Sequence, residues 1–249
     1  MAGHSHWAKV KHQKGLTDIR KGKLFSKLSR EISIAARLGG GDPTFNSRLR
    51  RAIANAKDEG VPLENITRAI QKGTGEIAGS HYEDVLYEGY GPGGVAVLIE
   101  AATDNRNRTT AEIRNLFSKY GGNLGAAGSV SWIFQKKGRI VLDGDQNDFD
   151  RVFEVALEAG AEDVEQKGSE IEVICLPEKL DELQKHLDTA GLTIKSSQIT
   201  YLPKNSISVT DKETFKSLYR LLDILEDHDD VQNVYANFDA PQELLEQCE

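Results

Sequence analysis

The stretch of sequence that decides the fold is residues 138–203, GRIVLDGDQNDFDRVFEVALEAGAEDVEQKGSEIEVICLPEKLDELQKHLDTAGLTIKSSQITYLP. Short runs rich in Val and Ile alternate there with longer segments whose apolar residues recur at helical spacing. The pattern predicts strands at 139–142, 163–166, 170–175 and 193–201, and helices at 147–159 and 178–190. Strand, helix, strand, strand, helix, strand is the order of a ferredoxin-like sandwich, and we expect this stretch to contain a complete one.

The segments on either side supply the parts of a second sandwich. Before the stretch come strands at 82–87 and 95–101, a helix that a Thr109–Glu112 capping box opens, and a strand at 130–135. After it come a strand at 206–209, a helix at 212–226 and a strand at 231–238. We therefore predict one ferredoxin-like domain, 79–136 with 204–249, into which a second one, 137–203, is inserted.

Residues 1–78 predict a different kind of domain, built from helices. Three segments repeat apolar residues at spacings of three and four, which builds an apolar stripe on each helix. The stripes are Leu24, Leu28, Ile32 and Ala35; Phe45, Leu49, Ile53 and Ala56; and Ile66 with Ile70. Either Asp42 or Asn46 caps the second helix. The predicted fold class is α+β with three domains: a basic N-terminal three-helix bundle followed by two ferredoxin-like α/β sandwiches, one inserted into the other.

The net charge of −8 conceals an asymmetry along the chain. Residues 1–78 contain 15 Lys and Arg against 7 Asp and Glu, whereas residues 79–249 contain 16 against 32. A cationic domain joined to an anionic body indicates a polyanionic partner, such as a nucleic-acid backbone, which the body would repel. The alternative is a solvated helical surface that happens to be basic.

Residues 2–16 have no periodicity and little that could form a core, so we expect an arm that orders on its partner. Imidazole, indole and ammonium groups alternate in it, a mixture suited to unpaired bases and phosphates. The predicted contacts are His4, His6, Trp7, Lys9, Lys11, His12 and Lys14. A metal site is the other interpretation of the histidines, but their spacing matches no common ligand pattern and no metal is predicted.

Cations also recur on one face of the first predicted helix, roughly opposite its apolar stripe. These are Arg20, Lys23, Lys27, Arg30 and Arg37, and the second helix adds Arg48, Arg50 and Arg51. In the body, Arg106 and Arg108 occupy a polar loop after a strand, where they could make a second, minor contact with phosphate or protein. The alternative for this loop is that Arg106 pairs with Asp104 or another acidic neighbour.

Other functional classes have little support in the sequence. No apolar run is long enough to span a membrane and no signal-peptide core follows the first charges, so we expect a cytoplasmic protein. Cys175 and Cys248 have no metal-site spacing, and Cys175 fits a buried strand. No nucleophile elbow or phosphate-binding loop appears, so no enzyme, cofactor or small-molecule substrate is predicted. The acidic residues, Glu88 and 227–230 among them, are interpreted as solvated loop charges.

Several motifs together resemble those of one family. They are AGHSHWAKVKHQK (2–14), SKLSREI (26–32), GGGDP (39–43), LRRAIANAK (49–57), ENITRAIQKGTGE (64–76), YEGYGPGG (87–94), TDNRNRT (103–109) and GSVSWIFQKKG (128–138). The sequence resembles the YebC/PmpR family, whose mitochondrial relatives include the translational activator of cytochrome c oxidase subunit I. The resemblance implies a cytoplasmic protein with a helical N-terminal domain and two α/β domains.

The resemblance implies a function in gene expression but leaves its target open. Bacterial members are usually labelled DNA-binding transcriptional regulatory proteins, and other members are linked to the ribosome and to translation of proline runs. We therefore expect a non-enzymatic, nucleic-acid-binding regulator, with a DNA-binding transcriptional regulator as the first hypothesis. A ribosome-associated factor that binds ribosomal RNA and assists difficult, proline-rich nascent sequences is the second, and a protein-interaction scaffold is the third. No helix carries an evident set of base-reading Asn, Gln and Arg residues, which indicates weak sequence specificity.

Overall fold

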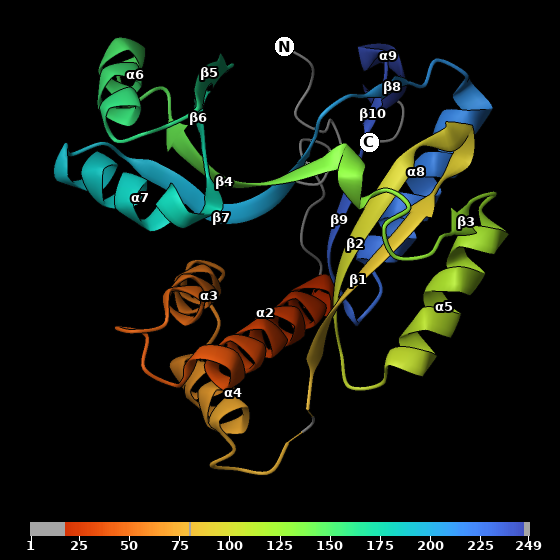
Figure 1. Cartoon of the computed structure of the whole chain (residues 1–249), viewed down its shortest axis with the longest axis horizontal. Helices are drawn as coiled ribbons and strands as arrows, with labels where there is room; N and C mark the ends of the chain where they lie inside the picture. The colour runs from red at the N-terminus through yellow and green to blue at the C-terminus, as the bar shows by residue number, and fades with distance from the viewer. Residues whose placement is uncertain (1–17, 80, 247–249) are drawn as a thin grey trace. The chain divides into compact units, whose positions relative to one another are not determined.

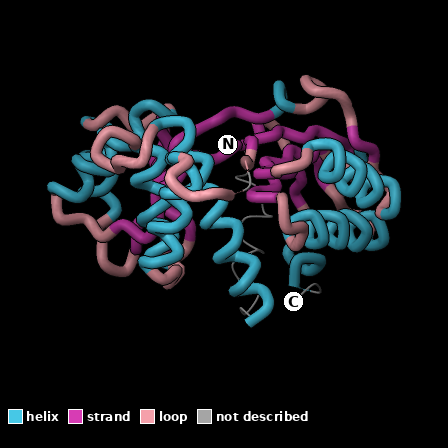
Figure 2. Tube along the Cα trace, turned by 90° about the horizontal axis from the view of Figure 1, so that it is seen from below, coloured by secondary structure: helices cyan, strands magenta, loops and turns pink. Residues whose placement is uncertain are grey.

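The computed structural model of the chain describes residues 18–79 and 81–246 (Figure 1). Packing divides these residues into two compact units, one formed by residues 135–202 and the other by the described residues on both sides of that segment. Helices and strands both contribute large parts of the described chain (Figure 2). Among the described helices, none is long and apolar enough to cross a membrane.

Three helices open the described chain: α2 (Asp18–Gly39), α3 (Ser47–Asp58) and α4 (Leu63–Thr74). Their shared core confirms the predicted three-helix bundle, with Ile32, Leu49 and Ile66 buried at its centre. Asn46, not Asp42, caps α3: its side chain accepts a hydrogen bond from the Leu49 N–H. Phe45 was expected on the apolar stripe of this helix, but it precedes the cap and is 87% exposed, so that prediction was wrong.

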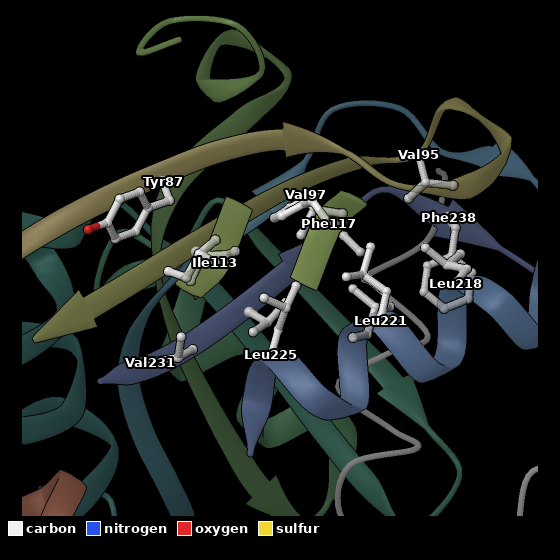
Figure 3. Packing of buried hydrophobic residues seen from close by; sticks show 14 of the residues in the cluster. Tyr87, Val95, Val97, Ile113, Phe117, Leu218, Leu221, Leu225, Val231 and Phe238 are labelled. Atoms are coloured by element: carbon white, nitrogen blue, oxygen red, sulfur yellow. The ribbon is translucent and has the colours of Figure 1, made fainter. Parts of the chain in front are cut away.

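The first unit also contains an antiparallel sheet with strand order β3-β1-β2-β9. The strands are β1 (Glu83–Tyr90), β2 (Ala96–Thr103), β3 (Asn123–Leu124) and β9 (Val231–Ala236). Helices α5 (Arg106–Lys119) and α8 (Lys212–Glu226) pack on this sheet, and their buried side chains meet those of β2 and β9 in one core (Figure 3). A short helix, α9 (Gln242–Glu246), ends the described chain.

Two strands predicted for this domain, at 130–135 and 206–209, differ in the structure. Residues 131–133 form a 3-10 turn instead of part of a strand, because Glu88 binds the N–H groups of the loop that leads into it. The segment β8 (Ile207–Ser208) pairs in parallel with β10 (Phe238–Asp239) in a separate two-stranded sheet. In the main sheet of this domain β2 pairs instead with β1, along the whole length of both strands.

The second unit confirms the predicted order of strand, helix, strand, strand, helix, strand. It consists of β4 (Phe134–Asp143), α6 (Phe149–Glu158), β5 (Asp163–Lys167), β6 (Glu170–Cys175), α7 (Leu180–Thr189) and β7 (Ile194–Pro203). The sheet order β5-β6-β4-β7 is that of a ferredoxin-like sandwich. Cys175 is buried in its core as predicted, and burial raises the pKa of its thiol to about 11.

The inserted segment leaves and rejoins the first unit at adjacent points. The backbone N–H of Lys204 donates a hydrogen bond of 2.9 Å to the carbonyl oxygen of Ile133. The Lys204 Nζ donates a second one, of 2.7 Å, to the carbonyl oxygen of Trp132. The two ends of the insertion are therefore held together by groups that belong to the first unit.

Candidate nucleic-acid interface

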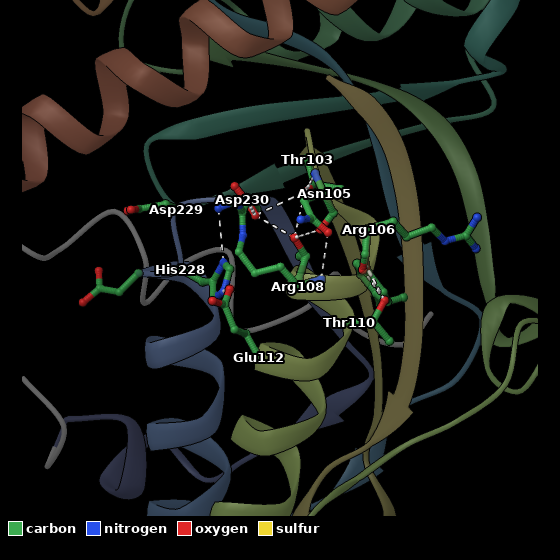
Figure 4. Close-up of polar contacts among 12 residues, drawn as sticks. Thr103, Asn105, Arg106, Arg108, Thr110, Glu112, His228, Asp229 and Asp230 are labelled. Atoms are coloured by element: carbon green, nitrogen blue, oxygen red, sulfur yellow. Dashed lines mark hydrogen bonds and ion pairs between the residues drawn. The ribbon is translucent and has the colours of Figure 1, made fainter. Parts of the chain in front are cut away.

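A buried carboxylate organises the region where α2 meets the sheet of the first unit. Asp230 follows α8 and is 3% exposed, and both of its carboxylate oxygens accept hydrogen bonds (Figure 4). Its Oδ1 lies 3.1 Å from Nη1 of Arg30, and its Oδ2 lies 2.6 Å from both Nη2 of Arg108 and Oγ1 of Thr109. Three elements, α2, α5 and the end of α8, therefore converge on one side chain.

The charge of Asp230 is stabilised by these partners. Burial raises the pKa of this carboxyl, but hydrogen bonds from Thr109 and Arg108, together with the charges of Arg108 and Arg30, outweigh burial and lower it. Asp230 is thus an anion near neutral pH, held between two guanidinium groups. The interpretation of residues 227–230 as solvated loop charge was wrong for Asp230, because its partners come from segments far away in the sequence.

The carbonyl oxygens at the end of α8 hold the cations of α2. Lys27 donates to the carbonyl of Glu226, Lys23 donates to that of Asp227 at 2.9 Å, and Arg30 donates to that of Asp229. The carbonyls of Glu226 and Asp227 end α8; such carbonyls lack partners within the helix and lie at the negative end of its dipole, so cations are favourable there. Three side chains of the predicted cationic ladder therefore bind protein oxygens in this structure.

A fourth predicted contact, Arg48 of α3, lies between two carboxylates. Its Nε is 2.8 Å from Oε1 of Glu31, and its Nη1 is 2.6 Å from Oδ2 of Asp84. Glu31 belongs to α2 and Asp84 to β1, so Arg48 connects the helical bundle to the first strand of the sheet. This bidentate arrangement suits a structural ion pair between the two parts of the first unit.

The two arginines at the start of α5 point to different places. Asn105 caps α5 by accepting a hydrogen bond from the Arg108 N–H, so Arg106 and Arg108 lie in the first helical turn and not in a loop. The predicted Thr109–Glu112 capping box was wrong, because Thr109 is a buried residue inside the helix. Asp104 pairs with Arg108 at 3.1 Å, and not with Arg106, whose exposed side chain points away from Asp230 (Figure 4).

The remaining described cations of the prediction gather toward the end of α2 and the start of α3. Arg37 is exposed in the last turn of α2. Arg50 is exposed on α3, and its Nη1 donates to the carbonyl of Pro43 at 3.0 Å. Arg51 is half-buried beside it in the sequence. The connection between the helices, residues 40–46, thus has guanidinium groups on both sides along the chain and carries the exposed Phe45.

Comparison with known proteins assigns the whole chain to one group. The TACO1/YebC N-terminal domain matches residues 5–76, and the TACO1/YebC second and third domain matches residues 82–238. The chain belongs to the TACO1/YebC family. A relative from Desulfotalea psychrophila, named probable transcriptional regulatory protein, is 55% identical over 99% of both chains. A relative of the same name from Aquifex aeolicus is 52% identical over 99% of both chains.

A solved structure agrees with this assignment. The crystal structure of a conserved hypothetical protein from Aquifex aeolicus superimposes with a TM-score of 0.86 and 50% sequence identity. The match covers 95% of this chain and 98% of the other. The fold of this TACO1/YebC protein is therefore shared with that structure over most of the chain.

One cluster in this TACO1/YebC chain has the composition of a metal site. Ligand atoms of Glu112, His228 and Asp230 lie within 4.8 Å of one another, beside an open cavity of ≈ 620 Å³. The Asp230 N–H donates to Nδ1 of His228 at 3.1 Å, so the ring proton is on Nε2, which lies 3.0 Å from Oε2 of Glu112. Each ligand atom already has a protein partner, and the Arg108 charge is adjacent, so the geometry favours a hydrogen-bonded network over cation binding.

A second buried carboxylate of this family member, Glu88, shapes the loop after β3. It accepts hydrogen bonds from the N–H groups of Gly128, Val130 and Ser131 at 2.7–2.8 Å. Burial raises the pKa of Glu88, but these three backbone donors outweigh it and lower the pKa. The interpretation of Glu88 as solvated charge was therefore wrong, since its backbone partners lie some 40 residues away and leave no local signal.

Part of the predicted interface lies outside the described residues or side chains. His4, His6, Trp7, Lys9, Lys11, His12 and Lys14 precede residue 18, and the side chain of Arg20 is not described. Sequence reasoning placed Phe45 on the apolar stripe of α3, because its spacing to Leu49 continues that stripe. Choosing Asn46 as the cap would have corrected this, since a side-chain cap there places Phe45 before the helix.

Proposed function

We propose that this TACO1/YebC protein is a non-enzymatic regulator of gene expression that binds nucleic acid, with DNA as its target, through residues 1–78. The observation that carries the proposal is the concentration of positive charge there, 15 Lys and Arg against 7 Asp and Glu, in a chain whose remainder is strongly acidic. The names of the relatives, probable transcriptional regulatory protein, support a role in regulation. We propose 1–78, 79–136 with 204–249, and 137–203 as the domain bounds.

The proposed contacts are divided between the arm and the end of the helical bundle. Lys9, Lys11 and Lys14 supply cations in the arm, and Arg37, Arg50 and Arg51 supply them around the α2–α3 connection. Lys23, Lys27 and Arg30 contribute less in this proposal, because their hydrogen bonds to the carbonyl oxygens of residues 226, 227 and 229 connect the bundle to the segment after α8, whereas the Arg50 bond to Pro43 stays within the bundle. Phosphate contacts of this kind position a protein on a duplex without reading its sequence.

The test is a salt titration of binding to duplex DNA with two matched sets of variants. Each lost phosphate contact should weaken binding to all sequences alike and flatten the salt dependence by about one unit. We expect this for Arg37→Ala, Arg50→Ala and Arg51→Ala. The double variant Lys23→Ala/Lys27→Ala should bind like the wild type. Binding that is absent at physiological salt, or that only the second set weakens, would contradict the proposal.

A second candidate is a ribosome-associated translation factor that binds ribosomal RNA. The composition of residues 2–16 favours it, because Trp7 and three histidines suit unpaired bases better than a duplex backbone. Sedimentation of the tagged protein through a sucrose gradient separates the candidates. Comigration with ribosomal subunits that deletion of residues 2–16 abolishes supports the translation factor. Absence from ribosomes, with enrichment of promoter fragments on pull-down, supports the DNA-binding regulator.

A further inference from the structure

Phe45 is a large aromatic residue whose side chain lies on the surface instead of in the core. It is 87% exposed, more than the other large apolar side chains of the described residues. A neighbour before the loop, Leu38, is also exposed, at 64%. Single exposed apolar residues are common on protein surfaces. Phe45 differs from such residues because hydrogen bonds fix the backbone of the loop that carries it.

The loop that presents Phe45 is fixed by buried hydrogen bonds. The Asn46 side chain donates to the carbonyls of Ala35 and Gly40, both at 2.8 Å, and accepts from the Leu49 N–H. The Phe45 N–H itself donates to the carbonyl of Asp42 at 3.3 Å. These bonds connect the end of α2, the loop and the start of α3, so the loop conformation does not depend on any contact of the Phe45 ring.

Close packing confirms that the loop has little room to change. A Cβ atom on Gly39 would lie 2.6 Å from the Asn46 amide nitrogen, and one on Gly41 would lie 2.8 Å from a methyl carbon of Thr74. Gly40 has a φ of 85°, which favours glycine. A ring presented by such a constrained loop loses little conformational freedom when it binds a partner, because the backbone is already ordered.

The charges beside the ring indicate the chemistry of that partner. Nη1 of Arg50 lies 3.0 Å from the carbonyl oxygen of Pro43, which places the guanidinium against the turn that carries Phe45. Arg37 is exposed at the end of α2, where the loop begins. Asp42 is the one carboxylate in residues 40–46, and hydrogen bonds from Thr44 lower its pKa. Two arginines thus flank, along the chain, a loop that carries one carboxylate and an exposed aromatic ring.

We infer that Phe45 stacks on an unpaired base of a single-stranded nucleic-acid segment, while Arg37 and Arg50 contact the adjacent phosphates. Aromatic rings stack on exposed bases whatever their identity, and flanking arginines track the backbone. A paired base within a duplex presents only its edges in the grooves, so the face of a ring has nothing to stack on there. The inference rests on the proposed binding of nucleic acid by residues 1–78 and adds the form of nucleic acid that is bound.

The test compares a fluorescein-labelled single-stranded DNA of mixed sequence with the fully paired DNA duplex of the same sequence, by fluorescence anisotropy on the full-length chain. Phe45→Ala should weaken single-strand binding by about 5- to 150-fold, the range expected for loss of one base stack. Phe45→Trp should retain binding because it retains a stacking face. Phe45→Leu should lose it although it remains apolar. Leu63→Ala is the matched control. Leu63 is 68% exposed at the start of α4, whereas Thr74, at the end of α4, lies beside Gly41 of the loop.

Salt dependence distinguishes stacking from phosphate contact. Phe45→Ala should lower affinity without changing the salt slope, whereas Arg50→Ala should flatten the slope by about one unit. Equal single-strand binding by Phe45→Ala and wild type, full binding by Phe45→Leu, or binding of the duplex alone would overturn the inference and leave the proposed function intact. If the wild type binds neither probe at physiological salt, the proposed function itself fails.

Discussion

Two basic regions of the helical bundle, the polar face of α2 and the α2–α3 loop, differ in what already surrounds their charges. On α2, Lys23, Lys27 and Arg30 reach carbonyl oxygens after α8, and Arg30 also reaches the buried Asp230. At the loop, Arg37 is exposed and Phe45 has its ring in solvent. A row of cations on a helix is therefore no evidence of a ligand until its protein partners are known.

The same comparison assigns different consequences to mutation. Charges on the α2 face hold the bundle to the sheet of the first unit, so their loss should change stability. Side chains at the loop rest on a backbone that other residues fix, so their loss should change binding. Variants in the two regions therefore test this division between stability and binding.

Asp230→Ala should produce the largest effect. It removes the shared acceptor of Arg30, Arg108 and Thr109 from a buried site, and loss of one partner of a buried ion pair typically costs about 3–5 kcal/mol. Urea unfolding measures the change in the free energy of unfolding. Asp229→Ala is the control, because its side chain is 67% exposed, and it should change stability by less than about 0.5 kcal/mol. Equal effects of the two variants would remove Asp230 from the centre of the network.

Acid should weaken the same network without any mutation. The folded-state pKa values of Asp230 and Glu88 are lowered, so their contribution to stability is present above the pKa of the unfolded groups, about 4. It is lost as the pH falls through the lower folded-state values, where the unfolded chain binds more protons. Unfolding followed between neutral pH and pH values below about 4 should show this loss. The dependence should be weaker in Asp230→Asn, and an unchanged profile there would exclude Asp230 as a source.

Lys27→Ala should have a smaller effect on stability. It leaves the Glu226 carbonyl without this donor at the end of α8, and an average hydrogen bond contributes about 0.5–1.5 kcal/mol. Thermal unfolding measures this change, with Lys57→Ala on the exposed surface of α3 as the control. Affinity for nucleic acid should be retained in both variants. If Lys27→Ala instead lost affinity with full stability, the α2 face would belong to the interface after all.

Phe45→Ala should have the smallest effect on stability, within about 0.5 kcal/mol, because the side chain is exposed and Asn46 fixes the loop. Circular dichroism during thermal unfolding measures it. Asn46→Ala provides the contrast, since it removes a helix cap and two further hydrogen bonds and should destabilise the bundle by about 1–2 kcal/mol. A large destabilisation by Phe45→Ala would mean that the ring packs against the protein in solution.

The sequence predicted the elements whose signals are local. The order of the inserted sandwich, the three helices and α8 all follow from apolar periodicity, and β6 and α8 have the predicted bounds. The sheet of the first unit was harder, because whether residues 206–209 join it depends on pairing between segments far apart in the sequence. Periodicity also misplaced Phe45, since one turn of apolar spacing continues across the cap of α3.

The candidate site was predictable in composition but not in geometry. Basic residues identified the helical domain as the cationic one, whereas their partners come from elsewhere in the chain. Arg30 meets Asp230 across 200 positions, and Arg48 meets Asp84 across 36. Burial of Asp230 and Glu88 followed from no local pattern, because each carboxylate is satisfied by donors far along the sequence.

The hydrogen bond between Lys204 and Ile133 also bears on how this chain can evolve. This bond joins the two points at which residues 135–202 leave and rejoin the first unit. For the first unit, which hosts them, the inserted residues are therefore equivalent to a loop whose ends are held together. The entropy of closing such a loop grows only by about 0.6 kcal/mol for each doubling of its length. Residues 135–202 can therefore lengthen, shorten or be exchanged for another compact module, while the host keeps its sheet, its two buried carboxylates and its basic bundle.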